Sequence, residues 1–244
     1  MHRLLALLAV LAALPTVAGC GDRDGRGSPP PAGATTLVLR LSELPGMLPP
    51  GGMAAVPPRY SLFGDGRLVS VPHGPSQGWP QLREDTVAPE GVRELYRAAT
   101  ALPDRPAANV PDGPVVQVTV GTAGGPHRIT LDRTNPAAAR LLAALARHAD
   151  GPPVPYEPAA VAIVATPADP AEPARPWPLP TLAGEPLGAT SAGSSCLVLR
   201  GAALDTARRA ATTADAAARW SSAGQVWQVA PRPLLPDETG CADL

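Results

Sequence analysis

The chain has 244 residues, of which 33 are proline and 24 are glycine, and its formal net charge is −1. This balanced charge gives no electrostatic reason to expect nucleic-acid binding. All 20 basic residues are arginines. The chain therefore offers no lysine for a Schiff base, for a Walker-A phosphate loop or for the S-x-x-K motif of penicillin-binding proteins. Its length suits one large domain or two modest ones.

The first twenty residues are typical of a secretory signal. A basic start at Met1–Arg3 precedes an apolar run at Leu4–Leu14, and small residues then lead to Cys20. A cysteine in this place resembles the lipobox of bacterial lipoproteins, so we expect a signal peptide over residues 1–19 and a diacylglyceryl thioether on Cys20. An uncut membrane span and a secreted protein without lipid stay open as alternatives. The apolar run is shorter than the roughly 20 residues that a spanning helix needs.

The two other cysteines, Cys196 and Cys241, form an even pair in a chain expected to reach an oxidising compartment. This context favours a disulfide. Such a bond would close a loop of about 46 residues and contribute on the order of 4 kcal/mol in the chain-entropy model. A metal pair and a reactive thiol are the alternatives. No histidine lies between the two cysteines and no C-x-x-C spacing is present, which argues against both.

Local patterns in the first two thirds of the chain predict an α+β domain over residues 35–165. Before it, residues 20–34 are rich in proline, glycine and charge, which predicts a disordered tether. A strand is expected at 35–41. The Asp65-Gly66 pair lies between two apolar runs and predicts a hairpin over 59–71.

Two helices and three further strands complete this domain. Apolar residues from Val92 to Leu102 recur on one helical stripe, which predicts a helix that begins near Pro89. Residues 115–120 and 127–131 are expected to form an antiparallel pair. Asn135 followed by proline is typical of a helix start. The apolar run at 159–165 is typical of a central strand.

The last third of the chain begins with a segment, residues 166–180, that holds six prolines and predicts a linker. Beyond it, residues 181–244 are expected to form a small disulfide-stapled β-α-β unit, with a strand at 196–199, a helix at 204–220 and a strand at 225–229. The expected fold is α+β, with a mainly antiparallel sheet and two or three packed helices. A division into two subdomains is left open.

The chain resembles a group of uncharacterised actinobacterial lipoproteins in three places. These are the sequence YSLFGDGR at Tyr60–Arg67, the order of helix and strand between Gly91 and Leu145, and the ending, which has Trp220–Gln225 and then RPLLPDE at Arg232–Glu238 before Cys241. The resemblance covers most of the mature chain. It implies lipoprotein status, and it implies no activity, ligand or catalytic residue.

Few side chains suggest catalysis. His73 and Ser76 are close in sequence, but no G-x-S-x-G elbow accompanies them. The neighbouring carboxylates Glu84–Asp85 and Asp237–Glu238 have the residue types of a glycosidase pair, yet solvated charge or an ion pair with Arg232 explains them more simply. The sequence contains no zinc-ligand or EF-hand spacing, so we expect no metal and no cofactor.

Four tryptophans, Trp79, Trp177, Trp220 and Trp227, account for half of the eight aromatic residues. Tryptophan is enriched at binding surfaces, so these side chains are candidates for a groove that contacts a glycan or a peptide. The alternative is core filling in a chain that has few bulky residues. Trp177 lies between two prolines, and we select it as the best candidate for a binding contact.

These observations lead to one expectation and two alternatives. We expect a non-catalytic binding module, anchored by lipid at the extracytoplasmic face of the cell membrane, whose partner is an envelope protein, a peptide or a wall component. The first alternative is a lipoprotein that binds a small ligand or solute. The second is an envelope hydrolase. The expected membrane contact is the lipid anchor alone.

Overall fold

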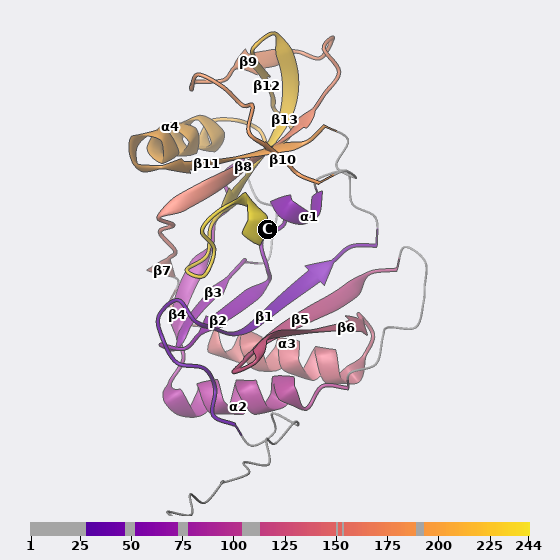
Figure 1. Cartoon of the computed structure of the whole chain (residues 1–244), viewed down its shortest axis with the longest axis vertical. Helices are drawn as coiled ribbons and strands as arrows, with labels where there is room; N and C mark the ends of the chain where they lie inside the picture. The colour runs from indigo at the N-terminus through magenta and orange to yellow at the C-terminus, as the bar shows by residue number, and fades with distance from the viewer. Residues whose placement is uncertain are drawn as a thin grey trace, which may run out of the picture.

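The computed structural model describes residues 28–46, 52–72, 78–103, 113–149, 151–152, 154–188 and 193–244. Within these ranges the chain forms a seven-stranded sheet and a six-stranded sheet, with helices packed on both (Figure 1). The mostly antiparallel strands together with helices confirm the α+β class. The predicted signal peptide and Cys20 lie outside the described residues.

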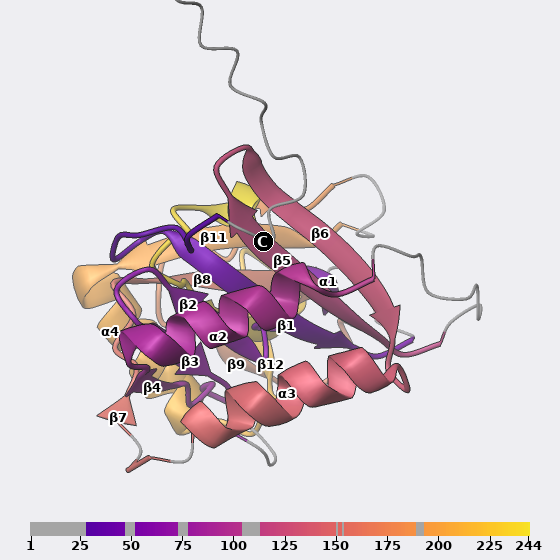
Figure 2. The same cartoon turned by 90° about the horizontal axis from the view of Figure 1, so that it is seen from below.

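The first sheet has the strand order β6-β5-β1-β2-β3-β4-β7, and every neighbouring pair is antiparallel. Its strands are β1 (Leu37–Leu44), β2 (Tyr60–Phe63), β3 (Arg67–Ser70), β4 (Arg83–Thr86), β5 (Val115–Thr122), β6 (Gly125–Asp132) and β7 (Val154–Pro155). Helices α2 (Pro89–Thr100) and α3 (Pro136–His148) lie side by side across one face (Figure 2). The main hydrophobic core fills the space between these helices and the sheet.

Local sequence signals explain these elements, and their predictions are confirmed. The side chain of Asn135 accepts a hydrogen bond from the backbone N–H of Ala137 at 2.9 Å and so caps α3. In α2, the side chains of Val92, Leu95 and Ala99 are buried in the stripe that the sequence indicates. Gly66 takes a φ of +88° in the turn that joins β2 and β3, a conformation that glycine adopts without steric cost.

The second sheet has the strand order β10-β11-β8-β13-β12-β9. Its strands are β8 (Ala160–Pro167), β9 (Ala174–Pro176), β10 (Glu185–Pro186), β11 (Ser195–Arg200), β12 (Arg219–Ser222) and β13 (Gln225–Pro233). Helix α4 (Gly201–Thr212) connects β11 with β12. Its leucine and alanine stripe packs on one face of the sheet together with all four tryptophans.

The boundary between the two structural units differs from the one predicted. Strand β8 pairs with β11 along one edge and with β13 along the other, so residues 160–165 belong to the second sheet and not to the domain expected over 35–165. Because β11 and β13 are joined only through β8, residues 181–244 are not a separate β-α-β unit. A short, wholly apolar run indicates a buried strand but carries no signal of which sheet receives it.

Three predicted segments need correction. The helix expected at 204–220 ends at Thr212, and Arg219 and Trp220 lie in β12. The expected linker at 166–180 contains β9, which pairs in parallel with β12. In residues 28–34 of the expected tether, the carbonyl oxygen of Ala34 accepts a hydrogen bond from Arg67 Nη2 at 2.7 Å. In each case a tertiary contact overrides the local preference.

The segment after β13 lies between the two sheets. Leu234 belongs to a cluster on the second sheet that includes Ala162 and Cys196, whereas the next residue, Leu235, packs against Phe63 and other apolar side chains of the first sheet. The predicted Cys196–Cys241 disulfide is present and ties the last turn, η1 (Cys241–Asp243), to β11. This C-terminal segment, residues 234–244, forms one wall of the candidate site.

Candidate functional site

The two faces of the first sheet differ in chemistry. Along β5, Val116, Val118 and Val120 are buried in the core beneath the helices. The alternating residues Gln117 and Thr119 face the opposite side, as the two-residue period of a strand requires. A cavity of about 630 Å³ lies over this polar face. Its size falls within the range of roughly 300–1,000 Å³ typical of small-molecule pockets.

The floor of the cavity is a row of polar residues that crosses three strands. Arg40 on β1 is opposite Thr119 on β5, and Thr119 is opposite Arg128 on β6. Ser42 and Gln117 form a second pair in the adjacent register. These two rows present guanidinium, hydroxyl and amide groups to the same space.

The walls of the cavity come from distant parts of the chain. One wall is helix α1 (Gly52–Ala55), which contributes Met53, together with Val56 and Pro58 after it. The other wall is the C-terminal segment, which contributes Asp237, Glu238 and Asp243. The cavity therefore exists only when the C-terminal segment lies on the first sheet.

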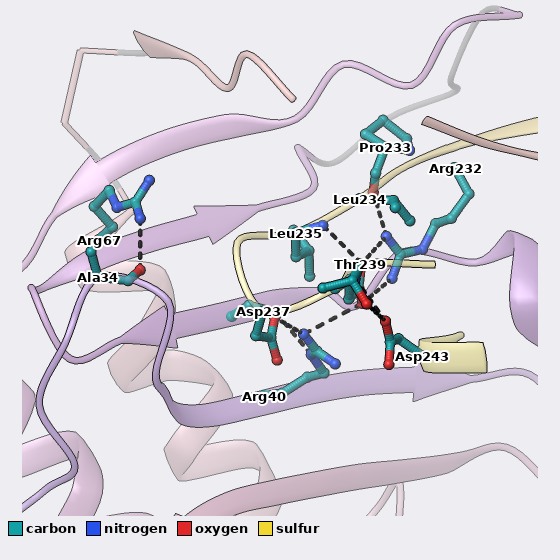
Figure 3. Close-up of polar contacts among 12 residues, drawn as sticks. Ala34, Arg40, Arg67, Arg232, Pro233, Leu234, Leu235, Asp237, Thr239 and Asp243 are labelled. Atoms are coloured by element: carbon teal, nitrogen blue, oxygen red, sulfur yellow. Dashed lines mark hydrogen bonds and ion pairs between the residues drawn. The ribbon is translucent and has the colours of Figure 1, made fainter. Parts of the chain in front are cut away.

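Two arginines hold the C-terminal segment in place through ion pairs (Figure 3). Arg40 Nη2 lies 2.7 Å from Asp237 Oδ1 and 3.4 Å from Glu238 Oε1. Arg232 binds Glu238 through two hydrogen bonds, Nη2 to Oε1 at 2.8 Å and Nη1 to Oε2 at 3.0 Å. Both side chains of this second pair are almost fully buried. The backbone N–H of Leu235 also donates to Glu238 Oε2, at 2.8 Å.

Two carboxyls of this wall have displaced pKa values. Burial raises the pKa of Asp237 above its usual value, Arg40 opposes that rise, and the Glu238 carboxylate adds to it. For Asp243, hydrogen bonds from the backbone N–H groups of Thr239 and Gly240 and from the Thr239 hydroxyl lower the pKa. Asp243 thus stays ionised and fastens the turn that closes the wall.

One arginine of the cavity has no carboxylate partner within the described residues. Arg40, Arg232, Asp237 and Glu238 neutralise one another. Arg128 lines the cavity and makes no ion pair or hydrogen bond with the described part of the chain. Its side chain comes from the exposed half of β6, where solvent reaches it. The cavity therefore offers a free guanidinium at one end of its polar floor.

The four tryptophans fill the core of the second sheet and do not line a binding groove. Trp177 is only 8% exposed, and its ring meets that of Trp220 edge-on with 5.3 Å between centroids. Trp79 and Trp227 are buried in the same cluster. The proline on each side of Trp177 is typical of an exposed loop. However, the backbone N–H of Trp177 donates a hydrogen bond to the carbonyl oxygen of Ser221 at 2.9 Å, which holds this residue against β12. Trp177 is therefore not available as a surface contact.

The other candidate residues are placed as follows. His73 and Ser76 lie outside the described residues. Cys196 is consumed by the disulfide, which excludes it as a free nucleophile in this structure. Glu238 forms an ion pair with Arg232, as the simpler interpretation of that motif predicts, whereas Asp237 pairs with Arg40.

Two findings concern the described ranges as a whole. No group of three or more His, Cys, Asp or Glu side chains could hold a metal ion there. Within the same ranges, no helix is both long enough and apolar enough to cross a membrane.

No protein-family model, curated protein sequence or solved structure shows significant similarity to this chain. The site is therefore defined by its geometry alone.

Local sequence patterns do not single out the residues that form the cavity floor. Arg40, Thr119 and Arg128 are the polar members of three strands that the sequence does predict, and alternation assigns them to the face away from the helices. A polar face of an antiparallel sheet is ordinarily just solvated. This face differs from an ordinary solvated face because the C-terminal segment covers it and encloses the cavity.

Proposed function

We propose that this protein is a lipid-anchored envelope lipoprotein that binds a small molecule in the cavity over the polar face of its first sheet. The cavity carries this proposal, because it combines a pocket-sized volume with convergent polar groups. It favours the small-ligand alternative over an envelope protein, peptide or wall component, since stable protein interfaces use broad surfaces of roughly 800 Å² per partner.

The lipid anchor rests on the sequence of residues 1–20 and on the resemblance to actinobacterial lipoproteins. Under this proposal, the anchor would lie close to the cavity. Pro31 lines the cavity, and Cys20 precedes Pro31 by 11 residues. An extended chain spans at most about 3.6 Å per residue, so the cavity would lie within about 40 Å of the lipid. A ligand that partitions to the membrane surface would be within reach.

A binding role is favoured over hydrolysis by the state of the cavity carboxylates. Glu238 and Asp237 are held by arginines, and Asp243 accepts three hydrogen bonds through Oδ2. A general base needs a carboxylate that is free to take a proton from substrate or water. In these three residues, the carboxylate oxygens are already engaged in the contacts that hold the C-terminal segment in place.

Native mass spectrometry on the lipidated protein, extracted gently from its own membrane, tests the proposal. We expect a reproducible extra mass that corresponds to one small molecule per chain. A protein partner in place of the small molecule would support the other binding interpretation. A protein that carries no additional mass over repeated preparations would contradict the proposed function.

A further inference from the structure

The charges around the cavity define the kind of ligand it would take. Three arginines and three carboxylates line it, but they are not equivalent. Arg40 and Arg232 are engaged by Asp237 and Glu238, and Asp243 is satisfied by backbone and hydroxyl donors. Arg128 is left as the one arginine of the cavity that has no carboxylate partner in the described chain. A ligand that completes this site brings a negative charge.

The residues next to Arg128 also favour an anionic group. Thr119 is directly opposite it on β5, and Arg40 follows one strand further on. Neighbouring strands lie about 4.8 Å apart, so the backbones of the two arginines are separated by about 10 Å, with the Thr119 hydroxyl between them. Neither Thr119 nor Gln117 uses its side chain in a hydrogen bond within the described chain, so both remain available to a ligand oxygen.

The opposite wall of the cavity is apolar. Leu44, Ala54, Val56 and Pro58 line it, together with Met53. The Met53 side chain is 58% exposed, which makes it one of two large hydrophobic residues that the described chain leaves in solvent. Methionine is flexible and polarizable, and it adapts to irregular apolar surfaces. An alkyl or isoprenoid group against this wall would remove Met53 from water.

We infer that the ligand is a singly anionic amphiphile, with a carboxylate on Arg128 and an apolar chain against Met53 and Val56. The inference rests on the proposed binding function and specifies its ligand class. A guanidinium binds such a group through two parallel N–H···O bonds, which is a directional and charge-assisted interaction. The polar floor positions the headgroup, and the α1 wall removes the chain from water.

The test uses calorimetric titration of the full chain with Cys20→Ser, so that no detergent micelle competes for the amphiphile. The probes are decanoate, the uncharged alcohol decanol and acetate, which has the charge without the chain. We expect decanoate to bind most tightly. Loss of a charge-assisted hydrogen bond weakens binding by about tenfold or more, and decanol should show this loss.

The matched variants are Arg128→Gln and Arg140→Gln. Arg140 is also an exposed arginine without a described partner, but it lies on α3, on the far side of the sheet. Arg128→Gln should bind decanoate about as weakly as the wild type binds decanol, and Arg140→Gln should match the wild type. A circular dichroism spectrum unchanged by either variant would exclude misfolding as the cause.

Several outcomes would overturn the inference while leaving the binding function intact. If decanoate and decanol bind with equal affinity, the ligand does not need a negative charge. The same conclusion follows if Arg128→Gln binds decanoate as tightly as the wild type. If acetate and decanoate bind with equal affinity, the ligand does not need an apolar chain. A neutral or cationic molecule found on the native protein would contradict the ligand class directly. If the native protein carries no bound molecule, the proposed binding function itself is contradicted.

Discussion

Arg40 and Asp237 form an ion pair at 2.7 Å although 197 positions separate them in the chain. Arg40 belongs to the first strand of the first sheet, and Asp237 follows the last strand of the second sheet. Their contact places the C-terminal segment on the polar face of the first sheet. Without it, that face would be an ordinary solvated surface, and the cavity would have no second wall.

The buried pair formed by Arg232 and Glu238 should be the most sensitive polar contact of this wall. Replacement of Glu238 by glutamine leaves the Arg232 guanidinium buried without a counter-ion. Removal of one partner from a buried ion pair costs about 3–5 kcal/mol. We expect the free energy of unfolding in urea to fall by this amount.

Glu90→Gln is the matched control for that variant, because Glu90 and Arg93 form an exposed ion pair one helical turn apart. An exposed pair of this kind is worth about 0.5 kcal/mol or less. Equal stability loss in Glu238→Gln and Glu90→Gln would show that the buried pair does not hold the segment.

Tyr156 joins the two sheets and should make stability depend on alkaline pH. Its hydroxyl donates a hydrogen bond to the carbonyl oxygen of Leu234 at 2.8 Å, and burial raises its pKa to about 12, against the opposing effect of Arg67. The unfolded side chain ionises near pH 10. The contribution of the neutral phenol is therefore complete below about pH 10 and is lost as the pH rises towards 12.

Tyr156→Phe should lower the free energy of unfolding by about 1 kcal/mol at neutral pH, because the hydrogen bond is lost. The variant should also lose less stability than the wild type between about pH 10 and pH 12, because it has no phenol to ionise there. Urea unfolding at several pH values measures both effects. Parallel pH profiles for the two proteins would contradict the assigned role of Tyr156.

The disulfide should stabilise both the fold and the cavity wall. Cys196 and Cys241 are separated by 45 positions, and closure of a loop of this length contributes about 4 kcal/mol in the chain-entropy model. For a chain of this size, 1 kcal/mol corresponds to about 2–4 °C in melting temperature. Reduction should therefore lower the melting temperature by about 10 °C.

The double variant Cys196→Ser with Cys241→Ser provides the control for reduction. It should melt at the temperature of the reduced wild type and should not respond to reductant. Thiol titration of the native protein gives a direct check, since two free thiols would refute the bond. A reductant effect that persists in the double variant would point to a cause other than this disulfide.

If Cys20 carries a lipid, the protein should be found in the membrane fraction. Cys20→Ser should release the protein from the membrane fraction, because loss of the acyl chains removes about 0.8 kcal/mol of membrane affinity for each buried methylene. Cell fractionation and mass analysis of the N-terminal peptide measure this. An unmodified N-terminus in a wild-type protein that stays with the membrane would contradict the anchor.

Elements that depend on neighbouring residues could be predicted from the sequence. The hairpin around Gly66 and the cap at Asn135 are fixed by turn and helix-start chemistry within a few positions. Strand β4 was missed because its residues, Arg83–Thr86, are polar and lack the alternation of a half-buried strand. Trp177 was misplaced because its proline-rich surroundings indicate a loop, whereas a strand more than forty residues later draws it into the core.

The candidate site could be predicted only in part. Alternation on β1, β5 and β6 identifies Arg40, Thr119 and Arg128 as residues of the outward face. The cavity depends on contacts between the first sheet and residues 234–244, and no local pattern encodes a pairing over that distance. The predicted ion pair with Arg232 is confirmed for Glu238, whereas Asp237 pairs with Arg40, and no local pattern indicates that Arg40 takes part.

The most direct test compares bound ligand in two tryptophan variants by native mass spectrometry on the lipidated protein. Thr119→Trp fills the cavity from its floor, whereas Thr86→Trp adds the same bulk to an exposed strand position of the same sheet, outside the cavity. Strands tolerate tryptophan well, so both variants should fold. We predict that the small bound mass of the wild type persists in Thr86→Trp and disappears in Thr119→Trp. Retention of the same mass by Thr119→Trp would contradict the cavity as the binding site.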